Sequence, residues 1–265
     1  MKAREKLYEG KAKILYATDD PDVIIQYFKD DATAFNAAKR GTIAGKGVMN
    51  NAISALLFEY LAGRGVKSHF IERRSEREML VRRVEIIPLE MVVRNVVAGS
   101  LAKRMGLEEG EDLPRPIVEW YYKRDDLGDP FLNEDHVLVF GLCDGDTLRE
   151  MRETTLRINE LLREFFLARD ILLVDFKVEF GRARTGELLL ADEITPDGCR
   201  LWDRATRQKL DKDRFRRDLG GVEEAYREVL SRVRRAAPSG SDTPGVDTHR
   251  VDTHKVDTRR AGGKA

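Results

Sequence analysis

The most regular stretch of the chain lies between residues 171 and 180, where apolar and charged side chains alternate. A period of two residues is the pattern of a β-strand, whose successive side chains point to opposite faces of the sheet. One face would carry Val174, Phe176, Val178 and Phe180, and the other Asp175, Lys177 and Glu179. The pattern therefore predicts a strand with one face in the core and the other available for chemistry.

A second apolar run follows this strand and ends on two acids. The chain passes through a loop bounded by glycines and continues over 187–193, which ends on Asp192 and Glu193. Folded as a β-hairpin, the two runs would bring Glu179 close to Asp192. Carboxylates beside Lys177 suit a magnesium–nucleotide complex, which needs hard oxygen ligands for the metal and a cation for the phosphates. The alternative is a solvated polar face whose acids are balanced by that lysine.

The first third of the chain is rich in strand patterns. Residues 7–16 and 23–28 have the composition of short strands, and 71–84 contains further strand-like runs. Residues 48–62 place apolar side chains at the spacing of one helical face and stop at a glycine. These side chains are Ile53, Leu56, Leu57, Tyr60 and Leu61. We expect a β-rich N-terminal lobe over 1–84, with the helix packed on its sheet.

From residue 85 the pattern changes to long helices around fewer strands. An apolar strand is expected over 91–98, a turn at Gly99, and helices at about 147–168 and 222–235. With the acidic hairpin between these helices, the second lobe, 85–237, is also α+β. The chain is thus predicted to be a two-lobed α+β protein with antiparallel sheets and packed helices.

The last segment, 238–265, does not have the composition of a folded domain. It begins with a stretch rich in Pro, Ser and Gly and continues into a five-residue repeat from Val246. Such a polar repeat cannot build a core, so we expect a disordered tail. Weak metal binding by His249 and His254 is the alternative.

Composition narrows the class of protein. The 265 residues include 47 basic and 47 acidic side chains, so no overall field attracts nucleic acid or an anionic membrane. Two cysteines, Cys143 and Cys199, are too few for a disulfide framework and suit a reducing compartment. The charged N-terminus lacks the apolar stretch of a signal peptide, and no run reaches membrane-spanning length. We expect a cytoplasmic protein.

Standard nucleotide motifs are missing from the sequence. The segment 41–47 resembles a phosphate loop but has one spacer residue too few, and Gly47 stands where a metal-binding hydroxyl should be. The chain also has no G-x-G-x-x-G turn, kinase catalytic loop, nucleophile elbow or H-E-x-x-H motif. The sequence therefore gives no motif evidence for the enzyme classes that these motifs mark.

Three local groups of cations remain as candidate binding sites. Lys11 and Lys13 follow Gly10 and would share one face of a strand, which suits a polyphosphate; an edge strand protected by lysines is the alternative. Arg94 precedes a glycine turn and a short helix that starts near Ser100, a combination that could hold a phosphate monoester. A capping serine with a structural arginine would explain the same pattern.

The third group follows the acidic hairpin directly. Asp197 and Arg200 lie on a turn that would present both side chains beside the candidate metal site. Arginine is suited to bidentate recognition of phosphate or carboxylate.

Several sequence blocks together resemble the SAICAR synthetase (phosphoribosylaminoimidazole-succinocarboxamide synthase) family of purine biosynthesis. The blocks cover 7–13, 92–95, 98–101, 173–181, 192–193, 196–203 and 211–216. They run in family order from Leu7 to about Val233, so the resemblance covers nearly all of the chain before the tail. It implies a two-lobed fold related to ATP-grasp and kinase-like lobes, and a homodimer.

The resemblance also implies the reaction and the roles of the site residues. L-aspartate would be joined to carboxyaminoimidazole ribotide (CAIR) with ATP and Mg²⁺, through an acyl phosphate, because a carboxylate is a poor electrophile until its oxygen becomes a leaving group. Glu179 and Asp192 would hold magnesium and act with Lys177 at the reacting groups. Nucleotide contacts are implied for Gly10, Lys11, Ala12, Lys13, Lys123 and, at the adenine, Val81, Arg82 and Val84. Arg94, Ser100 and Arg200 would bind the ribotide phosphate, Asp197 its sugar, and Asp129, Asp175 and Arg216 would serve as substrate or supporting groups.

Two other functions fit a two-lobed nucleotide site. A small-molecule kinase would use the same metal and phosphate contacts, and a non-catalytic nucleotide-binding protein would bind ATP without turnover. The segment 34–40 departs from family members that carry an acid near Asn36, so the aspartate pocket is not defined by the resemblance. The repeat tail has no counterpart in the family.

Overall fold

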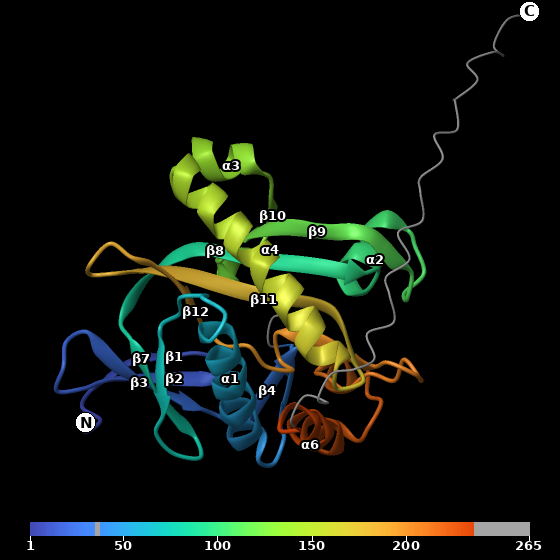
Figure 1. Cartoon of the computed structure of the whole chain (residues 1–265), viewed down its shortest axis with the longest axis horizontal. Helices are drawn as coiled ribbons and strands as arrows, with labels where there is room; N and C mark the ends of the chain where they lie inside the picture. The colour runs from blue at the N-terminus through green and yellow to red at the C-terminus, as the bar shows by residue number, and fades with distance from the viewer. Residues whose placement is uncertain (35–37, 236–265) are drawn as a thin grey trace, which may run out of the picture.

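Two antiparallel sheets organise the computed structural model, which describes residues 1–34 and 38–235 (Figure 1). The first sheet has the strand order β1-β2-β3-β7-β6. Its strands are β1 (Lys6–Glu9), β2 (Lys13–Ala17), β3 (Val23–Phe28), β6 (Phe70–Arg73) and β7 (Glu78–Arg82). A separate two-stranded ribbon consists of β4 (Asp31–Ala34) and β5 (Lys39–Thr42). The segment around Asn36 and the predicted tail, 238–265, lie outside the described residues.

The second sheet follows directly in the chain. Its order is β10-β9-β8-β11-β12, with β13 paired to β11. The strands are β8 (Val84–Val96), β9 (Asp112–Tyr122), β10 (Phe131–Leu132), β11 (Ile171–Ala183), β12 (Leu188–Ala191) and β13 (Cys199–Asp203). Only Arg83 separates β7 of the first sheet from β8 of the second, so the chain passes from one sheet to the other through a single residue. This connection lies next to the predicted boundary after residue 84.

The helices pack around and between these sheets. They are α1 (Lys46–Ala62), α2 (Gly99–Met105), α3 (Glu134–Val139), α4 (Gly145–Leu167), α5 (Asp213–Arg216) and α6 (Val222–Val233), with a 3₁₀ turn at Asp125–Leu127. Figure 1 shows α4 crossing the second sheet, where it contacts β8 and β11. The predicted α+β class and antiparallel sheets are confirmed. In the described part of the chain, no helix is long and apolar enough to span a membrane.

The helix predicted over 48–62 is present as α1, but it is not buried on one face only. It contacts β3, β6 and β7 of the first sheet and α6 on another side, and Lys46, Asn50 and Ser54 are buried together with its apolar residues. A helix surrounded by protein has no need for a polar stripe. The one-faced pattern predicted from apolar spacing was therefore incomplete.

The main core lies between α4, α1 and the second sheet. The long strand predicted over 171–180 is confirmed as β11, with Phe176, Val178 and Phe180 in this core. Val174 is different: it packs in a separate apolar cluster with Val96 and Trp202. The pairing of β11 with β13 shifts register between Leu173 and Asp175, and such a bulge interrupts the alternation of faces. The prediction that Val174 shares a face with Phe176 was wrong for this reason.

The run 7–16, interpreted as a strand, is a hairpin. The strands β1 and β2 pair through Glu9 and Ile14, and residues 10–12 form the turn between them. Lys11 therefore lies on a turn, and the prediction that it shares a strand face with Lys13 was wrong. A glycine at the start of the sequence Gly10-Lys11-Ala12 is typical of a turn, so the signal was present in the sequence.

Candidate active site

A cavity of about 660 Å³ opens between the two sheets. Its wall is built from the β1–β2 turn, from β3, β7, β8 and β11, and from the segments that follow β12 and β13. All the site residues predicted from the sequence line it except Ser100. These are Gly10, Lys11, Ala12, Lys13, Val81, Arg82, Val84, Arg94, Lys123, Asp129, Asp175, Lys177, Glu179, Asp192, Asp197, Arg200 and Arg216. The roles given to them by family resemblance remain predictions.

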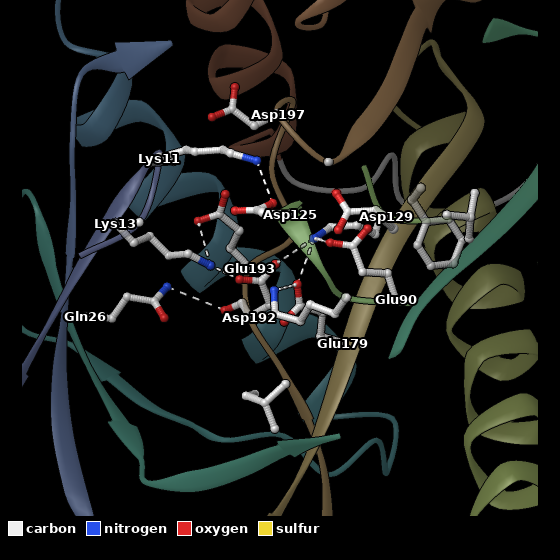
Figure 2. A pocket seen from close by; sticks show the side chains of 18 of the residues that line it. Lys11, Lys13, Gln26, Glu90, Asp125, Asp129, Glu179, Asp192, Glu193 and Asp197 are labelled. Atoms are coloured by element: carbon white, nitrogen blue, oxygen red, sulfur yellow. Dashed lines mark hydrogen bonds and ion pairs between the residues drawn. The ribbon is translucent and has the colours of Figure 1, made fainter. Parts of the chain in front are cut away.

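The acidic hairpin brings its two carboxylates to one lysine, as its sequence predicts. Glu179 on β11 pairs with Ala191 on β12, and Asp192 follows directly. Lys177 Nζ lies 2.8 Å from a Glu179 oxygen and 3.5 Å from an Asp192 oxygen. Lys13 crosses from the first sheet to contact Asp192, so the cluster joins both sheets (Figure 2).

More charges belong to this cluster than the sequence indicated. Lys123 Nζ lies 2.7 Å from Glu179, and Lys177 Nζ lies 2.7 Å from Glu90. Glu90 is contributed by β8, beside β11 in the sheet, and the register places it directly opposite Glu179. The sequence did not single out Glu90, because its position opposite Glu179 depends on a pairing between strands that are distant in the chain.

Glu179 is the acid of the cluster whose pKa is most clearly set by its neighbours. Burial alone would raise the pKa of Glu179, but Lys177, Lys123 and Lys13 outweigh this effect and lower the pKa to about 2. Burial likewise acts to lower the pKa of Lys177, and Glu179 and Glu90 reverse its effect, so the pKa of Lys177 is raised. Glu179 and Lys177 therefore hold opposite charges in a partly buried setting, where fixed charges act more strongly on a bound phosphate than they would in water.

The carboxylate oxygens near Asp192 suit the coordination of a divalent cation that is bound together with phosphate. Glu193 Oε2 is buried and has no hydrogen-bond partner among the described residues, and Lys13 Nζ lies 3.6 Å away. Asp192 adopts a left-handed backbone conformation with φ of 66°, which is uncommon for a residue other than glycine and turns its side chain toward the cluster. No group of three or more metal-binding side chains occurs in the described part of the chain. Magnesium commonly uses only one or two carboxylates, with phosphate oxygens and water completing its shell.

The candidate phosphate site at the other end of the cavity is a buried network. Arg94 donates to Glu119 at 2.6 Å, Asp175 at 2.9 Å and Ser100 at 2.8 Å. Arg200 donates to the same Asp175 oxygen at 2.7 Å. Ser100 does not line the cavity but reaches the site through Arg94. One shared carboxylate thus holds both guanidinium groups in place. A guanidinium group is a planar donor, and a fixed orientation suits its use in anion recognition.

The first residue of α2 leaves room for Arg200 in this network. Gly99 has φ of 55°, and a Cβ atom at this position would overlap the Arg200 guanidinium. Arg200 also donates to Asp213 at 2.9 Å, and Arg216 donates to the other oxygen of Asp213 at 2.5 Å. Asp213 therefore holds two of the predicted site residues, although no role was predicted for it.

Asp197 is held from three sides. Its carboxylate accepts from Lys46 at 2.6 Å, from Asn50 at 3.1 Å and from Tyr226 at 2.5 Å. Lys46 is completely buried at the start of α1, and Tyr226 lies on α6. Lys46 belongs to the segment 41–47, which was rejected as a phosphate loop. Its place at the start of an apolar helix is the feature of the sequence from which a buried contact could have been predicted.

The remaining predicted residues lie around the entrance and the apolar wall. Lys11 Nζ pairs with Asp125 at 2.7 Å, and both side chains are exposed. Burial, helped by Glu90 and Asp125, raises the pKa of Asp129. Val81 and Val84 line the cavity beside Arg82, whose guanidinium pairs with Glu187 at 3.2 Å.

Comparisons with known proteins agree with this geometry. The family model described as SAICAR synthetase matches residues 6–233. A phosphoribosylaminoimidazole-succinocarboxamide synthase of Clostridium botulinum (strain Loch Maree / Type A3) is 56% identical over 235 residues, which cover 89% of this chain and 100% of that protein. The crystal structure of the synthase from Ehrlichia chaffeensis has a TM-score of 0.85 at 47% identity and covers 86% of this chain and 98% of its own. A SAICAR synthetase solved in complex with ADP has a TM-score of 0.84 at 47% identity, covering 89% and 100%.

Proposed function

The chain belongs to the SAICAR synthetase family, and we propose that it is the carbon–nitrogen ligase that joins L-aspartate to CAIR with cleavage of ATP to ADP and phosphate. The observation that carries the proposal is that one and the same cavity holds the Lys177–Glu179–Asp192 cluster at one end and the Arg94–Asp175–Arg200 network at the other. A nucleotide and a phosphorylated substrate can meet between these two sites. The kinase and non-catalytic alternatives are not favoured by the relatives.

The reaction requires an activated carboxylate. An oxygen of the CAIR carboxylate attacks the γ-phosphorus of ATP, ADP leaves, and a mixed anhydride results. The aspartate amine then attacks the carbonyl carbon, loses a proton, and the C–O bond to phosphate breaks. Lys177 lies on β11 between Glu179 of the cluster and Asp175 of the arginine network, and its pKa is raised, so it is suited to stabilise negative charge on the transferring phosphoryl group or on the carboxylate.

The nucleotide end of the cavity is assigned from its lysines. Lys11, Lys13 and Lys123 would contact the ATP phosphates, supported by the backbone at Gly10 and Ala12, and Val81, Arg82 and Val84 would face the adenine. In this assignment the N-terminal lobe, 1–84, supplies most of the nucleotide contacts. The ADP complex of a 47% identical synthetase supports nucleotide binding at this fold.

Magnesium is part of the proposal. Glu179 and Asp192 would hold it, and Glu193, whose buried Oε2 accepts no hydrogen bond from any described residue, is a further oxygen ligand at the same place. When bound, the ion supplies charge neutralisation for the phosphates. Chelation with EDTA should stop ADP release, and added Mg²⁺ should restore it. Full activity in EDTA would contradict the metal assignment.

The ribotide would occupy the opposite end, formed by the second lobe, 85–237. Arg94, Ser100 and Arg200 would bind its phosphate, with Asp175 holding both guanidinium groups in place. Asp197 would contact the sugar. Asp129 and Arg216 line the cavity as substrate or supporting groups.

Other expectations from the family accompany the proposal. They are a homodimer, a cytoplasmic location, and small molecules as partners, with no nucleic acid or membrane. Light scattering tests the first of these expectations directly.

The function is tested by ADP release measured with a coupled assay. Purified protein is supplied with ATP, Mg²⁺ and CAIR, with and without L-aspartate, and the product is identified by mass. We expect ADP release that depends on aspartate and a succinocarboxamide product. Release without aspartate would indicate a kinase or ATPase, and binding without turnover would indicate a non-catalytic protein.

A further inference from the structure

One cation in the cavity wall has no partner among the residues that the structure describes. Within residues 1–34 and 38–235, nine lysine and arginine side chains line the cavity, and eight of them form ion pairs with carboxylates. The eight are Lys11, Lys13, Arg82, Arg94, Lys123, Lys177, Arg200 and Arg216. The ninth is Lys212, whose amine has neither an ion pair nor a hydrogen bond with any residue that the structure describes.

The carboxylate that acts most strongly on Lys212 does not pair with it, because that carboxylate is committed to other donors. Asp197 is the acid that acts most strongly on the Lys212 amine, but it already accepts from Lys46, Asn50 and Tyr226. Burial lowers the pKa of Lys212 more than Asp197 raises it. An ammonium group that is partly desolvated and unpaired is costly to hold, and an anionic ligand would offset this cost.

Lys212 lines the cavity, and its backbone is tied to segments that carry other site residues. Its backbone N–H donates to the Pro196 carbonyl at 3.1 Å, which ties it to the turn that contains Asp197 and Gly198. The Gly198 carbonyl accepts from the Lys177 backbone N–H at 2.9 Å. On its other side, Lys212 is followed by Asp213, the residue that holds Arg200 and Arg216. Lys212 is therefore beside the strand of Lys177 and next to the ribotide end.

The chemistry of the three substrates points to the ligand. The phosphates of ATP and of the ribotide each have assigned cations, whereas L-aspartate brings two carboxylates and has none. Its amine must reach the activated carbonyl carbon between the two ends, so its carboxylates must be anchored near that point. We propose that Lys212 binds a carboxylate of L-aspartate and so selects a dicarboxylate amine as the nucleophile. This inference rests on the proposed function.

The test compares Lys212→Met with a matched variant, Lys209→Met. Lys209 is three residues away, does not line the cavity, and pairs with Glu109 at 3.1 Å. KM is measured for aspartate, ATP and CAIR in turn, with the others saturating. Loss of a charged hydrogen bond should raise KM for aspartate roughly tenfold to a hundredfold in Lys212→Met, with KM for ATP and CAIR within about twofold. Lys209→Met should leave all three values unchanged.

Two further readouts separate binding from folding. The melting temperature of Lys212→Met should equal or exceed that of the wild type, because no ion pair is lost, and Lys212→Arg should recover much of the aspartate KM. If the KM for aspartate is unchanged in Lys212→Met, or if KM rises equally for all three substrates, the inference is wrong. The proposed function would still stand in that case, provided that the wild type shows aspartate-dependent ADP release. A wild-type protein without aspartate-dependent ADP release would overturn both.

Discussion

The buried ion pair between Lys46 and Asp197 allows a quantitative test of the structure. Lys46 has no exposed surface, and its Nζ lies 2.6 Å from Asp197 Oδ2. Replacing Lys46 with methionine keeps a similar length and removes the charge. Among the described residues, Asp197 would then keep Asn50 and Tyr226 as its side-chain donors. The perturbation therefore removes the strongest opposing charge from a buried carboxylate beside the cavity.

The expected loss is several kilocalories per mole. At 2.6 Å and an effective dielectric constant of about 20, the attraction between the two charges is about 6 kcal/mol. Desolvation of both ions offsets part of it, and removing one partner of a buried pair costs about 3–5 kcal/mol. Burial acts to raise the pKa of Asp197, but Lys46 reverses this and holds the pKa well below its ordinary value. A lowered carboxylate pKa stabilises the fold above the unfolded value, near pH 4, and this contribution is lost as the pH falls further.

Urea unfolding at pH 7 measures this loss. We expect Lys46→Met to unfold about 3–5 kcal/mol more easily than the wild type, and Lys46→Met with Asp197→Asn to recover part of the difference because no charge is left unpaired. The control is Lys6→Met, which breaks an ion pair with Glu9 at 2.7 Å whose two side chains are 54% and 40% exposed. Solvent screens that pair, so the control should unfold like the wild type. A loss below about 1 kcal/mol in Lys46→Met would refute the reasoning.

Three further predictions concern the cavity. Burial, with a smaller effect of Lys13, lowers the pKa of His69 to about 3. Below about pH 6.5 the unfolded chain therefore binds a proton that the folded protein does not, and the free energy of unfolding should fall by about 1.4 kcal/mol per pH unit. The variant His69→Gln should reduce this slope in urea titrations, and an equal slope would contradict a buried neutral imidazole. Glu179→Gln should lower kcat at least roughly a hundredfold while calorimetry shows unchanged CAIR binding, and retained turnover would exclude its metal role. Arg200→Lys cannot reproduce the bonds to two carboxylates and should raise KM for CAIR at least roughly tenfold, with KM for ATP as its internal control.

Short-range patterns in the sequence predicted the elements that carry the site. The alternation over 171–180 and the acidic end at Asp192 were enough to predict the hairpin, because strand period and hairpin geometry are local properties. The same period failed at Val174, where the partner strand β13 imposes a bulge. It also failed at Lys11, where a turn interrupts the expected strand.

Long-range partners could not be predicted from local patterns. Glu119 and Asp213, which hold the candidate phosphate-binding arginines, resemble ordinary surface acids in the sequence, yet the folded chain buries both. Lys46 meets a carboxylate 151 residues away. Pairings of this kind depend on how the two sheets and α1 meet, and a single sequence carries no direct signal for that arrangement.

At the proposed nucleotide end, the carboxylates that form ion pairs with the lysines are the same carboxylates that a divalent cation would need as ligands. Lys13 and Lys177 both face Asp192, and Lys177 also holds Glu179. A phosphate group that takes up these lysines must displace the carboxylates from them, and a displaced carboxylate that faces phosphate is repelled. Positive charge between the carboxylates and the phosphates removes this repulsion. We infer that ATP and a divalent cation bind more favourably together than either does alone, because only together do they leave every lysine and every carboxylate of the cluster with an opposite charge.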